Sequence, residues 1–323
     1  MKYVVVVLAV LFFLAGCSQS NQSNLSVNRT LSINSQVDRE SVIPIDQIKI
    51  TPETDVYPLI SYSDEYTDPV PMPYPINTRG AEDGGFMMPD GKTYYTWFTP
   101  SPSIPVEEQL FDQVTGIYVS YKTGDTWSTP ERVMLQDTGK VALDGCTFVL
   151  NNTMWFCSAR EGYTGMPWFT AEYANGSWGN IQEVNFDPEY EVGELFITPD
   201  GNEMYFGSAR PGGKGDLDIW LSRKINGEWA EPENIWIVNT LENEGWPMIT
   251  PNGDELWFTR IHGWLELWRS KKVMGEWQEP EKMFAPFAGE SSVDIDGNVY
   301  FTHHFYKDNK MLEADYYVAH HIR

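Results

Sequence analysis

Short apolar and aromatic segments alternate with polar turns along most of this chain, and the pattern repeats about every fifty residues. The clearest marker is a Gly-x-Trp turn, whose tryptophans are Trp127 (a variant turn), Trp178, Trp229 and Trp277. They lie 51, 51 and 48 residues apart. A fixed period of this length is typical of propellers and solenoids, in which each repeat is one supersecondary unit.

Each unit has the same order of signals: an apolar strand, a tight turn, an aromatic strand, a third strand and the Gly-x-Trp turn. The tight turns are Pro89-Asp90-Gly91, Asn151-Asn152, Pro199-Asp200-Gly201, Pro251-Asn252-Gly253 and Asp296-Gly297. Four short antiparallel strands in fifty residues are typical of a propeller blade. We therefore predict an all-β fold, a five-bladed β-propeller of four-stranded antiparallel blades over residues 43–323. We expect part of Ile43–Tyr62 to complete the fifth blade and close the ring.

Charge narrows the range of partners. The 323 residues include 46 acidic and 22 basic side chains, for a net charge of -24, while aromatic residues make up 14%. Such a chain folds and carries its acids on the surface. The charge repels nucleic acid and anionic membrane surfaces, so we exclude both as partners and expect a monomer.

The first residues have the pattern of a targeting signal. Val4–Leu14 is an apolar run too short to cross a bilayer as a helix, and Leu14-Ala15-Gly16-Cys17 follows it. This segment resembles the lipobox of bacterial lipoproteins. The resemblance implies a signal peptide over residues 1–17, a lipid on Cys17 and an extracytoplasmic protein anchored to a membrane. The alternative is an ordinary secretory signal with a chance cysteine. Residues 18–42, rich in Ser, Asn and Gln, are expected to form a flexible tether.

The third and fourth units carry a family resemblance. Pro199-Asp200-Gly201, Asp218-Ile219-Trp220 and Asn226-Gly227-Glu228-Trp229 resemble the WD40-like PD40 repeats of TolB-like propellers and of bacterial envelope lipoproteins. The resemblance implies the fold strongly and the function weakly, since such propellers serve as binding modules and as enzymes.

A candidate site lies where the innermost strands begin. Aligning the units on their turns places acids at nearly equivalent positions: Asp83, Asp144, Glu194, Glu244 and Glu290. Innermost strands line the channel of a propeller, so we expect these carboxylates to ring one mouth. The second strands return to that mouth with basic groups, Arg160, Arg210 and Arg260, and with His303 and His304 in the last unit.

Three interpretations of this set remain open. One acid and one arginine per unit fits a structural brace, because arginine binds a carboxylate through two hydrogen bonds. The same groups fit ligand binding, to a glycan or an envelope protein, which is the function we expect. The order Asp, Asp, Glu is also similar to inverting five-bladed glycosidases of the arabinanase and xylosidase type. That resemblance implies Asp83 as general base, Asp144 as the residue that tunes pKa and Glu194 as general acid.

Metal chemistry, as in a metal-dependent polysaccharide lyase, is a weaker alternative. All five histidines lie in the last two units, but no Cys or His spacing matches a zinc pattern. We therefore assign no metal ligand and no cofactor.

Two cysteines remain beyond Cys17. If Asn151-Asn152 is a two-residue hairpin turn, Cys146 and Cys157 face each other across two strands. They could form a disulfide or pack as thiols, and the hydrogen-bonded register favours thiols.

Overall fold

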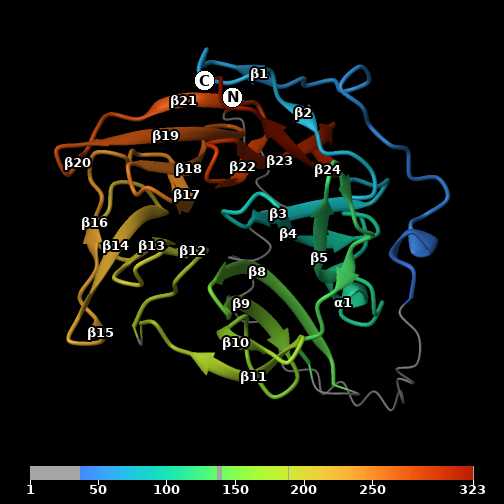
Figure 1. Cartoon of the computed structure of the whole chain (residues 1–323), viewed down its shortest axis with the longest axis horizontal. Helices are drawn as coiled ribbons and strands as arrows, with labels where there is room; N and C mark the ends of the chain where they lie inside the picture. The colour runs from blue at the N-terminus through green and yellow to red at the C-terminus, as the bar shows by residue number, and fades with distance from the viewer. Residues whose placement is uncertain (1–36, 137–139, 188, 323) are drawn as a thin grey trace.

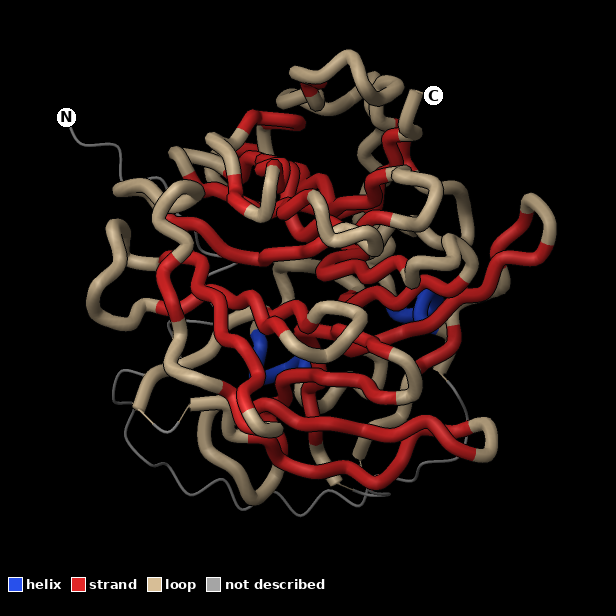
Figure 2. The backbone as a smooth tube through the Cα atoms, turned by 60° about the vertical axis from the view of Figure 1, so that its left-hand side comes forward, coloured by secondary structure: helices blue, strands red, loops and turns tan. Residues whose placement is uncertain are grey.

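The computed structural model describes residues 37–136, 140–187 and 189–322. Within these ranges the chain is nearly all β, and Figure 2 shows strands crossing most of the molecule. The helical elements among them are the 3-10 turn η1 (Arg39–Val42) and the helix α1 (Val106–Gln109). The predicted all-β class is confirmed. No helix of the described part has the length and apolar character needed to cross a membrane. The expected lipobox and Cys17 lie outside the described residues.

The strands of the described part form four hydrogen-bonded sheets, which Figure 1 shows arranged radially around a central axis. The first contains β8 (Ala142–Leu150), β9 (Thr153–Arg160), β10 (Trp168–Ala174) and β11 (Ser177–Val184). The second contains β12 (Leu195–Ile197), β13 (Glu203–Ser208), β14 (Asp218–Ile225), β15 (Glu228–Trp229) and β16 (Glu233–Asn234). The third contains β17 (Asn243–Ile249), β18 (Glu255–Ile261), β19 (Leu265–Val273), β20 (Glu276–Trp277), β21 (Glu281–Ala285) and β1 (Ile60–Ser61).

The fourth sheet joins the last repeat unit to the first. Its strands are β22 (Ala288–Val293), β23 (Val299–Lys307), β24 (Lys310–Ala319), β2 (Val70–Pro71), β3 (Ala81–Met87), β4 (Thr93–Thr99), β5 (Gly116–Thr123), β6 (Thr126–Trp127) and β7 (Glu131–Arg132). Both halves are antiparallel, and one parallel pairing of Ala314 in β24 with Ala81 in β3 connects them. The chain's final strand therefore pairs with the strand that begins the repeats.

The Gly-x-Trp turns are hairpin tips that pack on the preceding unit. Asn226 and Gly227 between β14 and β15 have φ of 54° and 89°, which matches a turn that needs two positive φ values. Trp178 contacts Tyr95 of the preceding unit edge to face at 6.4 Å, and Trp277 contacts Tyr205 in the same way at 6.2 Å. These contacts explain why the tryptophan recurs with the period of the fold.

The segment before β3 runs along the outside of the sheets. Arg39 is buried with its guanidinium over the rings of Phe98 and Tyr118, so packing begins inside the segment expected to be a tether. The strand β1 pairs with β21, and β2 pairs with β24. Part of Ile43–Tyr62 was expected to complete the fifth unit, and this was wrong. The strand within that segment, β1, pairs with β21 of the fourth unit, and the fifth unit is extended by β2, which lies after the segment.

Candidate functional site

Five innermost strands contact one another in turn: β3 with β8, β8 with β12, β12 with β17, β17 with β22 and β22 with β3. In four of these strands the register of the pairing with the following strand shifts, which marks a β-bulge. The first bulge residue has positive φ in each: Gly84, Cys146, Trp246 and Glu290. Glu194, directly before β12, occupies the equivalent place. A bulge inserts a residue and re-aims its side chain, here toward the centre.

These residues line a cavity of about 110 Å³ at the centre of the five strands. Its acidic side chains are Asp83, Glu194 and Glu290. Indole and sulfur groups from Trp246 and Cys146 form other parts of the wall. The volume accommodates several water molecules or a small polar ligand.

Asp83 is held as a carboxylate. Its Oδ1 accepts hydrogen bonds from the Gly84 amide at 2.9 Å and from His304 Nε2 at 3.0 Å. Burial opposes ionisation of Asp83, but the charge and hydrogen bond of His304 hold its pKa below the usual range. His304 Nδ1 lies 3.4 Å from the Phe287 carbonyl oxygen. Both ring nitrogens of His304 face oxygen atoms, and although burial lowers the pKa of His304, the charge of Asp83 and its hydrogen bond raise it above the usual value.

The other two acids favour the protonated form. Burial raises the pKa of Glu290 strongly, and the negative charges of Asp83 and Glu194 raise it further. Glu290 Oε2 accepts from the Gly84 amide at 2.9 Å. Burial also raises the pKa of Glu194; the Trp246 indole opposes this rise and Asp83 adds to it. The cavity thus combines one acid whose pKa is lowered with two acids whose pKa values are raised.

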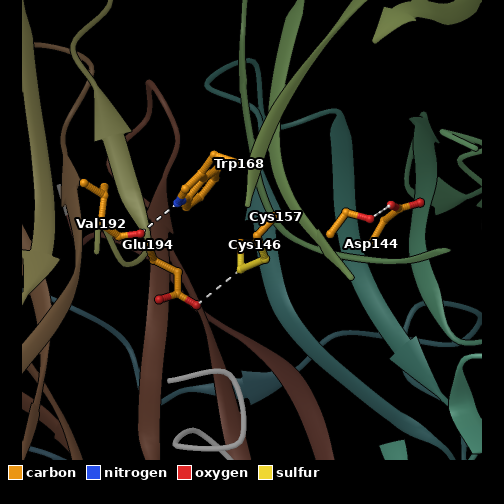
Figure 3. Close-up of a disulfide and its surroundings, with 7 residues drawn as sticks. Asp144, Cys146, Cys157, Trp168, Val192 and Glu194 are labelled. Atoms are coloured by element: carbon orange, nitrogen blue, oxygen red, sulfur yellow. Dashed lines mark hydrogen bonds between the residues drawn. A yellow bond between two sulfur atoms is a disulfide. The ribbon is translucent and has the colours of Figure 1, made fainter. Parts of the chain in front are cut away.

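Asp144 and Glu244 do not line this cavity, contrary to the expectation of five equivalent acids. Asp144 Oδ1 accepts from Ser158 Oγ at 2.6 Å and from Arg160 at 2.7 Å. Glu244 Oε1 accepts from Arg260 Nε at 2.7 Å. Each acid precedes its bulge by two residues, and Asp83 precedes Gly84 by one. A difference of one residue along a strand turns the side chain to the other face. In Figure 3 the Glu194 carboxyl group points to the disulfide, whereas Asp144 lies away from it.

The expected basic groups also lie outside the cavity. Arg160 and Arg260 pair with Asp144 and Glu244, and Arg210 pairs with Asp187 at 2.9 Å instead of with Glu194. His303 pairs with Asp55 at 2.8 Å. Adjacent strand residues face opposite ways, so only one histidine of the pair reaches Asp83, and it is His304.

Cys146 and Cys157 form a disulfide with a Cα–Cα distance of 5.4 Å, so the preference for packed thiols was wrong. The expected register holds from Leu150 and Thr153 to Phe148 and Trp155, and then the bulge shifts it. Cys157 consequently pairs with Gly145, and Cys146 turns its sulfur toward Cys157 from within the bulge.

Sequence reasoning missed Cys146 as part of the wall and selected His303 where His304 makes the contact. The positions of the glycines could have indicated which acids face the centre. Aligning the units on Gly145, Gly193, Gly245 and Gly289, instead of on the acids, places Glu194 and Glu290 directly after the glycine and Asp144 and Glu244 directly before it.

One set of side chains in the described part has the proximity that a cation would need. Ligand atoms of Asp83, Glu290 and His304 lie within 4.8 Å of one another. Both ring nitrogens of His304, however, already face oxygen atoms of Asp83 and Phe287, so a cation would have to displace one of these contacts. Asp83 and His304 form a hydrogen-bonded pair beside Glu290.

No family model matches the chain, and no curated protein matches it. Among solved structures, a putative TolB from Agrobacterium tumefaciens is 16% identical, with 84% of this chain and 88% of that chain covered and a TM-score of 0.44. Bacteroides ovatus xyloglucan PUL GH43B is 15% identical, covering 78% and 54%, with a TM-score of 0.49. The catalytic domain of Coprinopsis cinerea GH62 α-L-arabinofuranosidase is 10% identical, covering 80% and 96%, with a TM-score of 0.43. The neighbours include both kinds of protein that the sequence resembles. At this distance, function has to be inferred from the residues of the site.

Proposed function

We propose that the protein binds a neutral, hydroxyl-rich ligand, such as a sugar unit of a glycan, in the central cavity of a closed five-bladed propeller. The ring of contacts among β3, β8, β12, β17 and β22, and the pairing of β24 with β3, support five blades and closure. The central observation is that three acids with opposite pKa shifts line one cavity. The pKa of Asp83, which pairs with His304, is lowered, and the pKa values of Glu194 and Glu290 are raised, which favours one carboxylate beside two carboxylic acids.

This charge state suits hydroxyl groups. A carboxylic acid donates and accepts hydrogen bonds, as a sugar hydroxyl does, while Asp83 adds strong acceptor capacity. An anionic ligand would meet Asp83 and a chain with a net charge of -24. The ligand is therefore expected to be neutral.

A cluster of aromatic rings beyond His304 supports a ring-shaped ligand. Phe287, whose carbonyl contacts His304, stacks with Tyr306 at a centroid distance of 4.6 Å. Tyr57 and Trp264 contact Phe287 at 5.3 Å and 6.3 Å, and they are 43% and 46% exposed. These rings do not line the cavity itself, but exposed aromatic faces are suited to the apolar face of a sugar.

Binding is tested by a glycan-array screen, followed by isothermal titration with the best glycan. Asp83→Ala and Glu194→Ala each remove a hydrogen-bonding side chain, so each is expected to weaken binding about 10-fold or more. Glu172→Ala, which removes an exposed acid on β10, is the matched control and should bind as the wild type does. Equal affinity of the wild type and both cavity variants would contradict this site.

A second candidate is glycoside hydrolysis, favoured by the opposite pKa shifts of Asp83 and Glu194. Asp83 would take a proton from the attacking water, and Glu194 would give a proton to the leaving oxygen. Glu290, instead of Asp144, would be the acid that tunes Asp83. The low pKa of Asp83 makes it a weak base, so we favour ligand binding over hydrolysis as the function. Release of reducing sugar that Asp83→Asn abolishes and Glu172→Gln preserves would establish hydrolysis.

We also propose that Cys17 carries a lipid that anchors the protein outside the cytoplasm, with a glycan or an envelope protein as partner. Incorporation of a labelled fatty acid, lost in Cys17→Ala together with membrane association, tests this anchor. Labelling that persists in Cys17→Ala would refute it.

A further inference from the structure

The disulfide that lines the cavity touches one of its acids. Cys146 Sγ lies 3.7 Å from Glu194 Oε1, and Figure 3 shows the carboxyl group directed at the sulfur. Cys146 occupies one of the five bulge positions that face the centre, and its partner Cys157 is buried on β9. This contact is therefore part of the site.

The oxidation state decides what this contact can be. A disulfide sulfur carries no hydrogen, so in this structure Cys146 cannot donate to Glu194. A Cys146 thiol has one weak S–H donor at hydrogen-bonding distance for sulfur. A hydrogen bond to a carboxylate stabilises its charged form.

In the part of the chain that the structure describes, the other groups around Glu194 supply no positive charge, so a donor at Cys146 would have a strong effect on the ionisation of Glu194. Asp83 from β3 and Glu290 from β22 repel a negative charge on Glu194, and the Trp246 indole from β17 favours it. Gly207 from β13 contacts only the Glu194 backbone. Within the described residues, no ion pair involves Glu194. A new donor from β8 would thus act on an acid that has no cation to stabilise it.

We propose that Cys146 is a positioning residue for Glu194: the disulfide offers the Glu194 carboxyl group no hydrogen, and reduction supplies an S–H donor that favours the carboxylate. The proposal deepens the proposed function, because it makes the donor capacity of the site depend on redox state. A dithiol reductant supplies two electrons and two protons, the S–S bond breaks to give two thiols, and the dithiol becomes a disulfide. The Cys146 S–H then donates to Glu194.

The test is a titration of Glu194 by NMR on protein labelled at glutamate Cδ, with Glu194→Gln identifying the signal. The oxidised wild type is compared with the wild type in dithiothreitol and with two double variants. Cys146→Ser/Cys157→Ala breaks the disulfide and keeps a donor at residue 146. Cys146→Ala/Cys157→Ala breaks it and leaves none.

We expect the ionisation constant of Glu194 to rise about threefold to tenfold in the reduced wild type and in the serine variant, and not in the alanine variant. Equal titration of the two double variants, or no change in the reduced wild type, would overturn the proposal. Near-ultraviolet circular dichroism will reveal whether each double variant folds. Cys157→Ala, which keeps the Cys146 thiol, replaces the serine variant if necessary, and Cys146→Ala, which leaves no donor at residue 146, replaces the alanine variant. The titration needs no ligand, so a failed glycan screen leaves it intact, and a flat titration leaves glycan binding untouched.

Discussion

The acids of the innermost strands divide into two groups that differ by one or two residues along the strand. Asp144 and Glu244 are almost fully buried and each binds an arginine. Asp83, Glu194 and Glu290 line the cavity, and in the described part none of them pairs with an arginine. The first group stabilises the fold, and the second faces the central cavity. A shared sequence position relative to the turns therefore does not give a shared environment.

The largest expected effect comes from breaking a brace. In Arg260→Met the Glu244 carboxylate, whose side chain is fully buried, loses its cation, so the free energy of unfolding should fall by about 3 kcal/mol. The Thr240 bonds to Glu244 remain, and protonation can relieve the unpaired charge. Urea unfolding should thus show a greater loss at pH 8 than at pH 5. A loss below about 0.5 kcal/mol at both pH values would remove the distinction between brace and cavity.

This comparison also indicates what the sequence could predict. The period of Trp127, Trp178, Trp229 and Trp277 reflects hairpin tips that pack on neighbouring units, so the repeated all-β fold follows from it. The bulges could not be placed in the same way. The side chain at a bulge depends on tertiary pairing, and a shift of one residue separates Asp83 from Asp144 in orientation.

Contacts between distant segments could not be predicted from the sequence either. Asp55 meets His303 across 248 residues, and nothing in the local pattern around Asp55 distinguishes it from other polar residues. The pairing of β2 with β24 likewise depends on how the segment before β3 crosses the outside of the sheets. Local turn chemistry predicts hairpins, but not which strand completes a unit.

A smaller effect is expected from the cavity, with a characteristic pH dependence. The folded-state pKa of Glu290 is raised, so its contribution to stability is complete below the unfolded pKa of about 4.3 and is lost as the pH rises through the folded value. Asp83 has the opposite sign, since its lowered pKa adds stability that is lost as the pH falls. Glu290→Gln mimics the protonated acid. It should reduce the decline in unfolding free energy between pH 5 and pH 8 by about 1 kcal/mol.

Urea unfolding of the wild type and Glu290→Gln at pH 5, 6, 7 and 8 measures this difference, with Glu172→Gln as the control. Parallel curves for the wild type and Glu290→Gln would mean that Glu290 is ionised at neutral pH. In that case the cavity would carry a further negative charge, and a cationic ligand would fit it better than a neutral one.

The smallest expected effect on stability tests whether burial of an ion pair, and not pairing alone, makes it stabilising. Arg223 binds Glu203 and Glu233 at 3.1 Å and 2.8 Å, distances close to those of the buried braces, but its side chain is 47% exposed. Water already stabilises these charges, so Arg223→Met should lower the free energy of unfolding by less than about 1 kcal/mol. Urea unfolding beside Arg260→Met measures both under the same conditions. If the two variants lose equal stability, burial of the carboxylate is not what makes Glu244 and Asp144 structural, and the number of hydrogen bonds to arginine would have to explain their role.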